Sequence, residues 1–403
     1  MNLPRRRATF IPAVGPEFFS YWKKGCRHNG FDFKWFTPES FFQYPYALIN
    51  ASSGIENAWW WRKETGYPED NILMTDSGGY QIMSYAKKGR SAKISAGSSL
   101  RWQEANSDIG FNLDFPVSEN ANFEECLKKS IRNFDLFEQK RKNYSMKMYN
   151  ILHGRNLREI ETWYNAAKTF NFDGWAIGTK GGIYKQISAF LVLQEQDALN
   201  LKDSVHFFGT SNLQSMIALS MVAKHFDTAI TFDSSSYSLV SKFRNWNFPL
   251  SIRNVANFGR NATKSMKAIP CTCPVCIHAT INDIYSQTNY AAHLLIALHN
   301  LYQFVETNRL IGIMSDDEEV LADYAKSKKE RELIRNVASM LDEYEHSGYR
   351  STYGKFKDLI EGFSIEKSLK GGVRTTRRNI QRTRLEAAKT LANRSVLSAP
   401  SFS

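Results

Sequence analysis

The sequence predicts an α/β fold in which eight parallel strands close into a (β/α)8 barrel. Three observations support this prediction: eight short apolar runs, amphipathic helical patterns between several of them, and ionisable residues or glycines where the runs stop. A chain of 403 residues can bury the core of one such barrel. We therefore expect a barrel domain over residues 1–310 and a helical, basic C-terminal extension over residues 311–403.

The predicted strands are apolar runs bounded by polar segments. In chain order they are "TFIPAV" (9–14), "YALIN" (46–50), "NILMT" (71–75), "IGFNLD" (109–114), "MYNIL" (148–152), "GWAIG" (174–178), "VHFFG" (205–209) and "TAITFD" (228–233). Residues 157–170 and 213–226 place apolar side chains three and four positions apart, which indicates helices between strands. Strands that alternate with helices pair in parallel through crossovers, and eight of them suggest a closed barrel.

The residues at the ends of these strands indicate an active site. They are Asp76, Asp114, His153, Gly178, Gly209 and Asp233. Barrel enzymes build their active sites on this C-terminal rim. A single aspartate at such a position could equally be a helix cap or a turn residue. Three carboxylates at one rim favour catalysis.

A cysteine cluster predicts a metal site. The segment "PCTCPVC" places Cys271, Cys273 and Cys276 within six residues, a spacing that does not suggest a disulfide framework. Zinc prefers four sulfur or nitrogen ligands, and a closed set of four makes the site structural. His299 in "LLIALHNLYQF" is our choice for the fourth ligand, with His278 and His293 as competitors.

The charge of the chain is concentrated at its end. The formal net charge is +12, and the segment 367–394 carries nine Lys or Arg and one acid, Glu386. Such a run favours a nucleic-acid partner, although a solvated helical extension is the alternative. No apolar stretch is long enough to span a membrane, and the first residues lack a signal-peptide core. We expect a cytoplasmic protein, in the host cytoplasm if a phage encodes it, and the sequence leaves oligomerisation open.

Six motifs resemble one family. They are "MTDSGGYQ" (74–81), "SDIGFNLDFP" (107–116), "SVHFFGTSN" (204–212), "FDSSSYSLVSK" (232–242), "PCTCPVC" and "LHNLY". Their order is similar to that in the tRNA-guanine transglycosylase family. The likeness spans roughly residues 8–310 and is strongest to the archaeosine branch and to related phage and bacterial enzymes that insert 7-deazaguanines into DNA.

The resemblance implies catalytic roles for rim aspartates. Asp233 matches the nucleophile that attacks C1′ of the target nucleoside, and Asp76 matches the general acid/base. Asp227 also follows a phenylalanine, but it lies at the start of its strand, at the wrong end of the barrel. The assignment is chemically sensible, because base exchange with retained sugar configuration requires two inversions, hence a nucleophile and a proton-transfer group.

The resemblance also implies the base-binding residues Ser77, Gly79, Tyr80, Gln81, Asp114, His153, Gly178 and Thr179. An ionised Asp114 can accept hydrogen bonds from N1–H and the exocyclic amine of a guanine-like base. Tyr80 can stack on the base. The sequence departs from the family where His153 replaces a glutamine and Thr179 replaces a glycine, so the identity of the inserted base is open.

The function predicted from the sequence is replacement of guanine in DNA by a 7-deazaguanine such as preQ0, with zinc as the structural cofactor. The alternative is an archaeosine-type enzyme that acts on tRNA. Two further hypotheses are a zinc-containing nucleic-acid-binding barrel without catalysis and a glycosylase in which water replaces the incoming base.

Overall fold

The computed structural model describes most of the chain. The described residues are 3–58, 60–86, 89, 94–196, 198–199, 204–210, 212–242, 246–249, 255–258, 269, 271–285, 291–325 and 327–362. The basic segment 367–394 lies outside this part.

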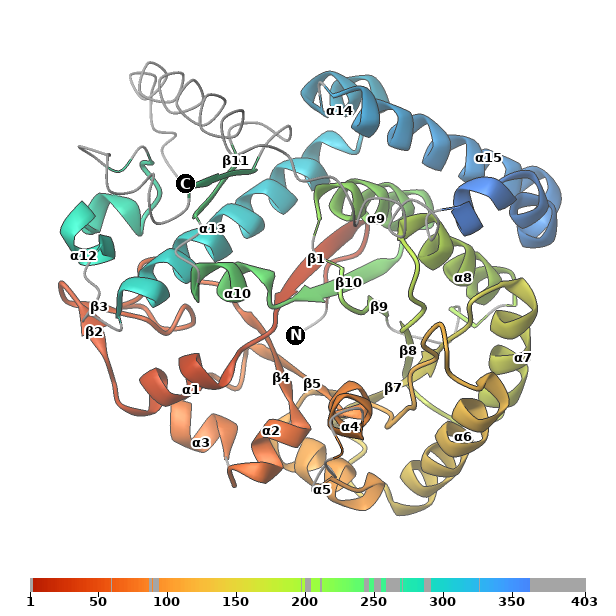
Figure 1. The fold of residues 1–403 in the computed structure, drawn as a ribbon, viewed down its shortest axis with the longest axis horizontal. Helices are drawn as coiled ribbons and strands as arrows, with labels where there is room; N and C mark the ends of the chain where they lie inside the picture. The colour runs from red at the N-terminus through yellow and green to blue at the C-terminus, as the bar shows by residue number, and fades with distance from the viewer. Residues whose placement is uncertain are drawn as a thin grey trace.

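All eight predicted strands are present and pair in parallel around a barrel (Figure 1). They are β1 (Arg7–Pro12), β4 (Tyr46–Asn50), β5 (Ile72–Asp76), β6 (Ile109–Phe111), β7 (Lys147–Leu152), β8 (Gly174–Ile177), β9 (Val205–Phe207) and β10 (Ala229–Ser234). The order around the sheet is β1-β10-β9-β8-β7-β6-β5-β4. A parallel bridge between Ala13 and Leu48 joins the two ends, supported by a 2.8 Å hydrogen bond from Val14 N–H to Leu48 O. The predicted (β/α)8 fold is therefore confirmed.

Helices follow the strands and form the outer layer (Figure 1). They are α1 (Pro16–Lys23), α2 (Ala51–Glu56), α3 (Trp61–Thr65), α4 (Gly79–Ala86), α5 (Ala96–Asn106), α6 (Phe123–Lys140), α7 (Leu157–Ala167), α8 (Ile183–Glu195), α9 (Leu213–His225) and α10 (Ser236–Lys242). Polar side chains cap the N-termini of several of these helices. Asn156 and Asn212 each accept a backbone N–H from the third residue of the following helix, which satisfies a donor that the helix leaves open.

The strands are buried on both faces, as expected where helices cover a parallel sheet. In β10, the apolar residues Ile230 and Phe232 are fully buried, and they alternate along the strand with Thr231 and Asp233. Side chains two residues apart on a strand share a face. Thr231 and Asp233 therefore point to the same side of the strand, so the polar side chain of Thr231 lies next to Asp233 on that face.

Small strands and helices lie outside the eight-stranded sheet. They are β2 (Arg27–His28), β3 (Phe31–Asp32), β11 (Trp246–Pro249), β12 (Val255–Phe258), η1 (Cys276–His278) and α12 (Ile281–Tyr285). The first two strands pair with each other, as do the last two. None extends the barrel sheet.

Three helices close the C-terminal part: α13 (Ala291–Met314), α14 (Glu318–Ala325) and α15 (Lys328–Lys355). Helix α13 is fixed to the barrel, because Asn308 donates to Ala8 O at 2.7 Å and Asn300 donates to Tyr237 O at 3.1 Å. Residue 310 lies inside this helix, so the division at 310/311 stays a prediction. Helix α15, drawn in blue, packs outside α8 and α9, and α14 lies against α13 and α15 (Figure 1). Among the described residues, no helix is both long and apolar enough to cross a bilayer.

Candidate active site and metal centre

Asp233 stands at the C-terminal end of β10, at the rim of the barrel. Its Oδ1 accepts a hydrogen bond of 2.8 Å from Gly209 N–H, and Nε2 of His206 lies 3.4 Å from the same oxygen. The side chain is 13% exposed, so the carboxylate is sheltered but reachable. Asp227 lies at the other end of β10 in a left-handed turn, where it pairs with Arg5 at 3.5 Å. Its position agrees with its exclusion as the nucleophile.

Asp76 closes β5 and is partly buried. Asn50 donates to its Oδ2 at 2.5 Å, and Gly78 N–H donates to its Oδ1 at 3.3 Å. Burial, followed by the negative charge of Asp114, raises the pKa of Asp76 from 3.8 to about 7; Asp233 adds to the rise, and the two hydrogen bonds oppose it. A carboxyl group with this pKa exchanges protons near neutral pH, as a general acid/base must.

Asp114 follows β6 and is paired with a histidine. Nε2 of His153, at the end of β7, lies 2.5 Å from its Oδ2, and both side chains are buried. Two glycines make room for this pair. A Cβ on Gly79 would lie 2.7 Å from Oδ1 of Asp114, and a Cβ on Gly178 would lie 2.2 Å from Cε1 of His153. Glycine at these positions therefore allows the pair to form.

Several predicted base contacts have polar atoms without a protein partner. Ser77 Oγ, Gln81 Oε1 and Thr179 Oγ1 are buried and make no hydrogen bond within the described part of the chain. Most buried polar groups in proteins are hydrogen-bonded. Three such atoms contributed by two rim segments therefore indicate a place for a polar ligand.

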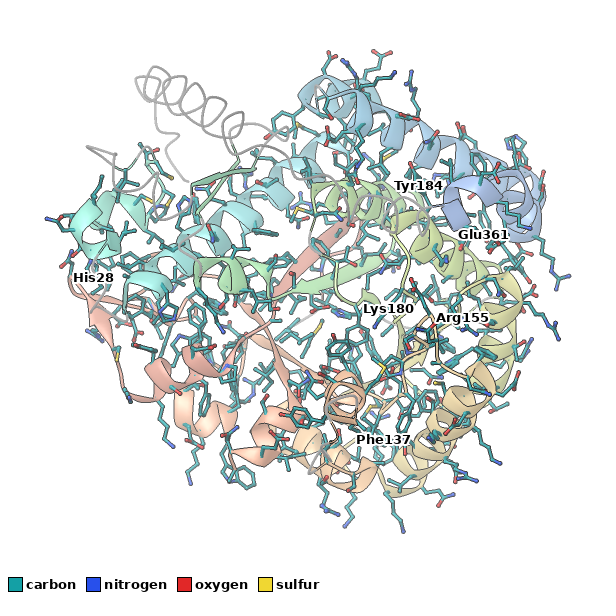
Figure 2. The ribbon with its side chains drawn as sticks, viewed as in Figure 1. His28, Phe137, Arg155, Lys180, Tyr184 and Glu361 are labelled. Carbon is teal, nitrogen blue, oxygen red and sulfur yellow. The ribbon has the colours of Figure 1, made fainter. Side chains whose placement is uncertain are left out.

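An aromatic ring and a cation meet above these residues. Tyr80 on α4 is 55% exposed, and the Lys180 ammonium lies 5.0 Å from its ring centre. In Figure 2, Lys180 lies inside the ring of helices. An exposed tyrosine can stack on a nucleobase, and a nearby cation suits a negatively charged polymer.

The sequence reasoning missed two neighbours of the rim aspartates, Asn50 and His206, and it also missed Lys180, which lies over the Tyr80 ring. Asn50 and His206 lie inside the apolar runs "YALIN" and "VHFFG". A polar residue inside a strand that is buried on both faces is the signal that could have found them.

The four predicted metal ligands converge. The donor atoms of Cys271, Cys273, Cys276 and His299 all lie within 4.8 Å of one another. His299 Nδ1 is 3.7, 3.3 and 3.2 Å from the three sulfurs in that order. Tetrahedral zinc, with bonds of about 2.3 Å to sulfur and about 2.0 Å to nitrogen, requires such separations of roughly 3.5 Å. The donor set and its spacing therefore fit Zn²⁺.

The competing histidines are engaged elsewhere. The His278 ring lies 4.2 Å from the Phe31 ring, and the His293 ring lies 6.3 Å from the Tyr21 ring. Neither belongs to the four-residue cluster, whose histidine is His299. Four protein donors leave no coordination position for water, which is the pattern of a structural site.

A parallel barrel with carboxylates gathered at its C-terminal rim has the architecture of a barrel enzyme. Comparison with known families makes this specific: the family described as TGT, Queuine tRNA-ribosyltransferase, matches residues 43–311, more than half of the chain. The chain belongs to this family.

Curated relatives of the chain include archaeal proteins named tRNA-guanine(15) transglycosylase. That of Methanococcus aeolicus is 26% identical over 312 residues, covering 70% of this chain and 46% of the relative. That of Methanocaldococcus jannaschii is 25% identical over 310 residues, covering 73% and 43%. That of Saccharolobus solfataricus is 24% identical over 312 residues, covering 73% and 56%. The chain thus spans about half the length of these relatives.

Proposed function

We propose that this protein is a guanine transglycosylase that exchanges a guanine in a nucleic acid for a 7-deazaguanine. The observation that carries the proposal is the gathering of Asp76, Asp114 and Asp233 at one rim, where burial raises the pKa of Asp76 to about 7 and the charges of the other two aspartates add to the rise. Family membership supports the same reaction.

The two exchange steps require two different carboxyl groups. In the first, Asp233 forms a bond to C1′ as the C1′–N9 bond breaks, and the electron pair of that bond goes to the guanine, which takes a proton from Asp76. In the second, the incoming base gives its N9 proton to Asp76, and N9 displaces Asp233 from C1′. The division suits the two residues, because the raised pKa of Asp76 lets it exchange a proton near neutral pH, and Asp233, with 13% of its side chain exposed, is reachable by the sugar.

Base recognition falls to Asp114 with His153. The Asp114 carboxylate suits the N1–H and amine edge of a guanine-like base. His153 occupies the position where the family usually has glutamine, and its contact with Asp114 ties the two side chains together. Ser77, Gln81 and Thr179 supply further polar atoms that lack protein partners.

The comparisons support tRNA as the polymer better than DNA, since the curated relatives are named for a tRNA position. We therefore propose tRNA as the leading substrate. DNA, the main expectation from the sequence, remains the second candidate because the motifs resemble those of the DNA-modifying branch. Zn²⁺ bound by the Cys3His cluster would stabilise the fold and take no part in base exchange.

Incubation with labelled guanine tests this function. Parallel reactions would contain a tRNA transcript or a guanine-containing DNA duplex. Incorporation of label into tRNA supports the leading proposal, and incorporation into DNA alone supports the second candidate. Abasic sites without incorporation would indicate a hydrolase, and no reaction with either polymer would contradict transglycosylation.

A further inference from the structure

His206 on β9 lies in the barrel interior next to the candidate nucleophile. The residue is fully buried, and its ring packs against Phe111 and Phe208 at centroid distances of 4.8 and 4.7 Å. Nδ1 lies 2.9 Å from Oγ1 of Thr231, its partner in the β9–β10 register. Nε2 lies 3.4 Å from Oδ1 of Asp233 and has no regular hydrogen bond within the described part of the chain.

These contacts select one tautomer of the imidazole ring. A carboxylate oxygen only accepts hydrogen bonds, so an Nε2 lone pair that faced Asp233 would be repelled. With the proton on Nε2, the ring donates toward Asp233, and Nδ1 accepts from the hydroxyl of Thr231. Each group then has a complementary partner, and the Thr231 contact fixes the ring orientation.

The donors around Asp233 approach one oxygen only. Oδ1 receives the Gly209 N–H at 2.8 Å and faces Nε2 of His206 at 3.4 Å. Oδ2 takes no hydrogen bond from the described residues. A carboxylate with one oxygen hydrogen-bonded to Gly209 N–H and facing His206 leaves the electron pairs of the other oxygen available for attack.

We propose that His206 is a positioning residue for the nucleophile, which acts with the Gly209 N–H to hold Oδ1 of Asp233 so that Oδ2 attacks C1′. This inference rests on the proposed function. In the attack, Oδ2 forms the new bond to C1′, the C1′–N9 electron pair leaves with the base, and Oδ1 becomes the carbonyl oxygen of the ester. The His206 proton stays on Nε2, and the 3.4 Å contact has room to shorten as the carboxylate turns toward the sugar.

A packing role alone makes a different prediction. A ring that only packs against Phe111 and Phe208 could be replaced by phenylalanine without loss of rate. The positioning role requires a donor at Nε2 and an acceptor at Nδ1. His206→Phe keeps an aromatic ring without either group, whereas His206→Gln retains an amide donor. Thr231→Val keeps the imidazole and removes the hydroxyl that fixes its tautomer.

The test measures single-turnover formation of the covalent adduct with a tRNA transcript and with a guanine-containing DNA duplex, together with the KM for free guanine. We expect His206→Phe to slow adduct formation about 10- to 100-fold, the range for loss of a hydrogen bond to an ionised group. His206→Gln should recover most of the rate, and Thr231→Val should slow the same step by a smaller factor. The KM should stay within about twofold, because the base contacts are intact.

Two results would overturn the assignment: adduct formation by His206→Phe at the unaltered rate, or equal losses in the Phe and Gln variants of similar thermal stability. If His206→Phe does not fold, Thr231→Val decides, and an unchanged rate in that variant counts against the role. Failure of the unaltered protein to form any adduct with either polymer would refute the proposed function itself, a result distinct from a variant that reacts normally.

Discussion

Nε2 of His153 lies 2.5 Å from Oδ2 of Asp114, and both side chains are buried at the rim of the barrel. The contact joins a residue typical of the family to one that departs from it. The His153 ring also packs edge-on against Trp163, with centroids 4.9 Å apart, so its position is fixed from two sides. We infer that the pair, rather than Asp114 alone, reads the base.

Restoring the family residue tests this inference. We expect His153→Gln to change the ratio of kcat/KM values for guanine and 7-deazaguanine bases by about 10-fold, since one hydrogen-bonding group in a buried site is worth about that factor. Adduct formation by Asp233 should change little, because His153 contacts Asp114. An unchanged base preference would show that His153 does not contribute to recognition.

Asp233→Asn should abolish exchange while leaving the fold intact. The amide keeps the shape of the side chain but removes the attacking charge, and loss of a covalent nucleophile costs on the order of 10⁴-fold or more. With the incoming base withheld, the unaltered protein should form an adduct with nucleic acid that survives denaturant, and the variant should form none. Exchange at the normal rate by Asp233→Asn would place the nucleophile elsewhere.

Asp76 should make the stability of the protein depend on pH. Its pKa is about 7 in the fold, against an ordinary 3.8, so between these values the folded state binds more protons than the unfolded chain. Ionisation of Asp76 therefore lowers the free energy of unfolding as pH rises through this window, by at most about 4 kcal/mol. This loss of stability is absent below about pH 4 and complete above about pH 7.

Asp76→Asn removes this titration and the proton-transfer group together. The free energy of unfolding of the variant, minus that of the unaltered protein, should be larger at pH 8 than at pH 4. The variant should also exchange bases much more slowly. Urea unfolding at the two pH values measures the first effect. An equal stability difference at both would contradict the raised pKa.

Cys273→Ser should lose zinc and destabilise the C-terminal part of the barrel. The site connects the cysteine segment to α13, and a structural zinc site contributes to the folding free energy. Metal analysis and thermal unfolding measure the two effects. His293→Ala is the matched control and should keep full zinc occupancy. Zinc retained by Cys273→Ser, or lost from His293→Ala, would contradict the ligand set.

The basic segment 367–394 should contribute contacts to phosphates that do not depend on sequence. If four of its nine basic residues contact phosphates, deletion of residues 367–403 should reduce the log–log salt slope of nucleic-acid binding by about 3 to 4 units. Asp114→Ala should instead impair base exchange at every salt concentration, because that residue acts on the base. A truncated protein with an unchanged salt slope would assign the segment another role.

The sequence by itself determined the barrel, the rim and the cysteine cluster. Each of these depends on local information: apolar runs with helical patterns between them, residues at strand ends, and thiols within one short segment. For that reason Asp76, Asp114 and Asp233 could be selected before their mutual distances were known.

Only the tertiary structure decided which side chains meet. His206 lies 3.4 Å from Asp233, and His153 pairs with Asp114. His299, rather than His278 or His293, completes the Cys3His cluster. These contacts depend on the parallel register and on the bridge that closes the barrel, which bring distant parts of the chain together. No local period encodes such a distance. The raised pKa of Asp76 follows from the same closure, because its main cause is burial away from water and its second cause is the nearby charge of Asp114.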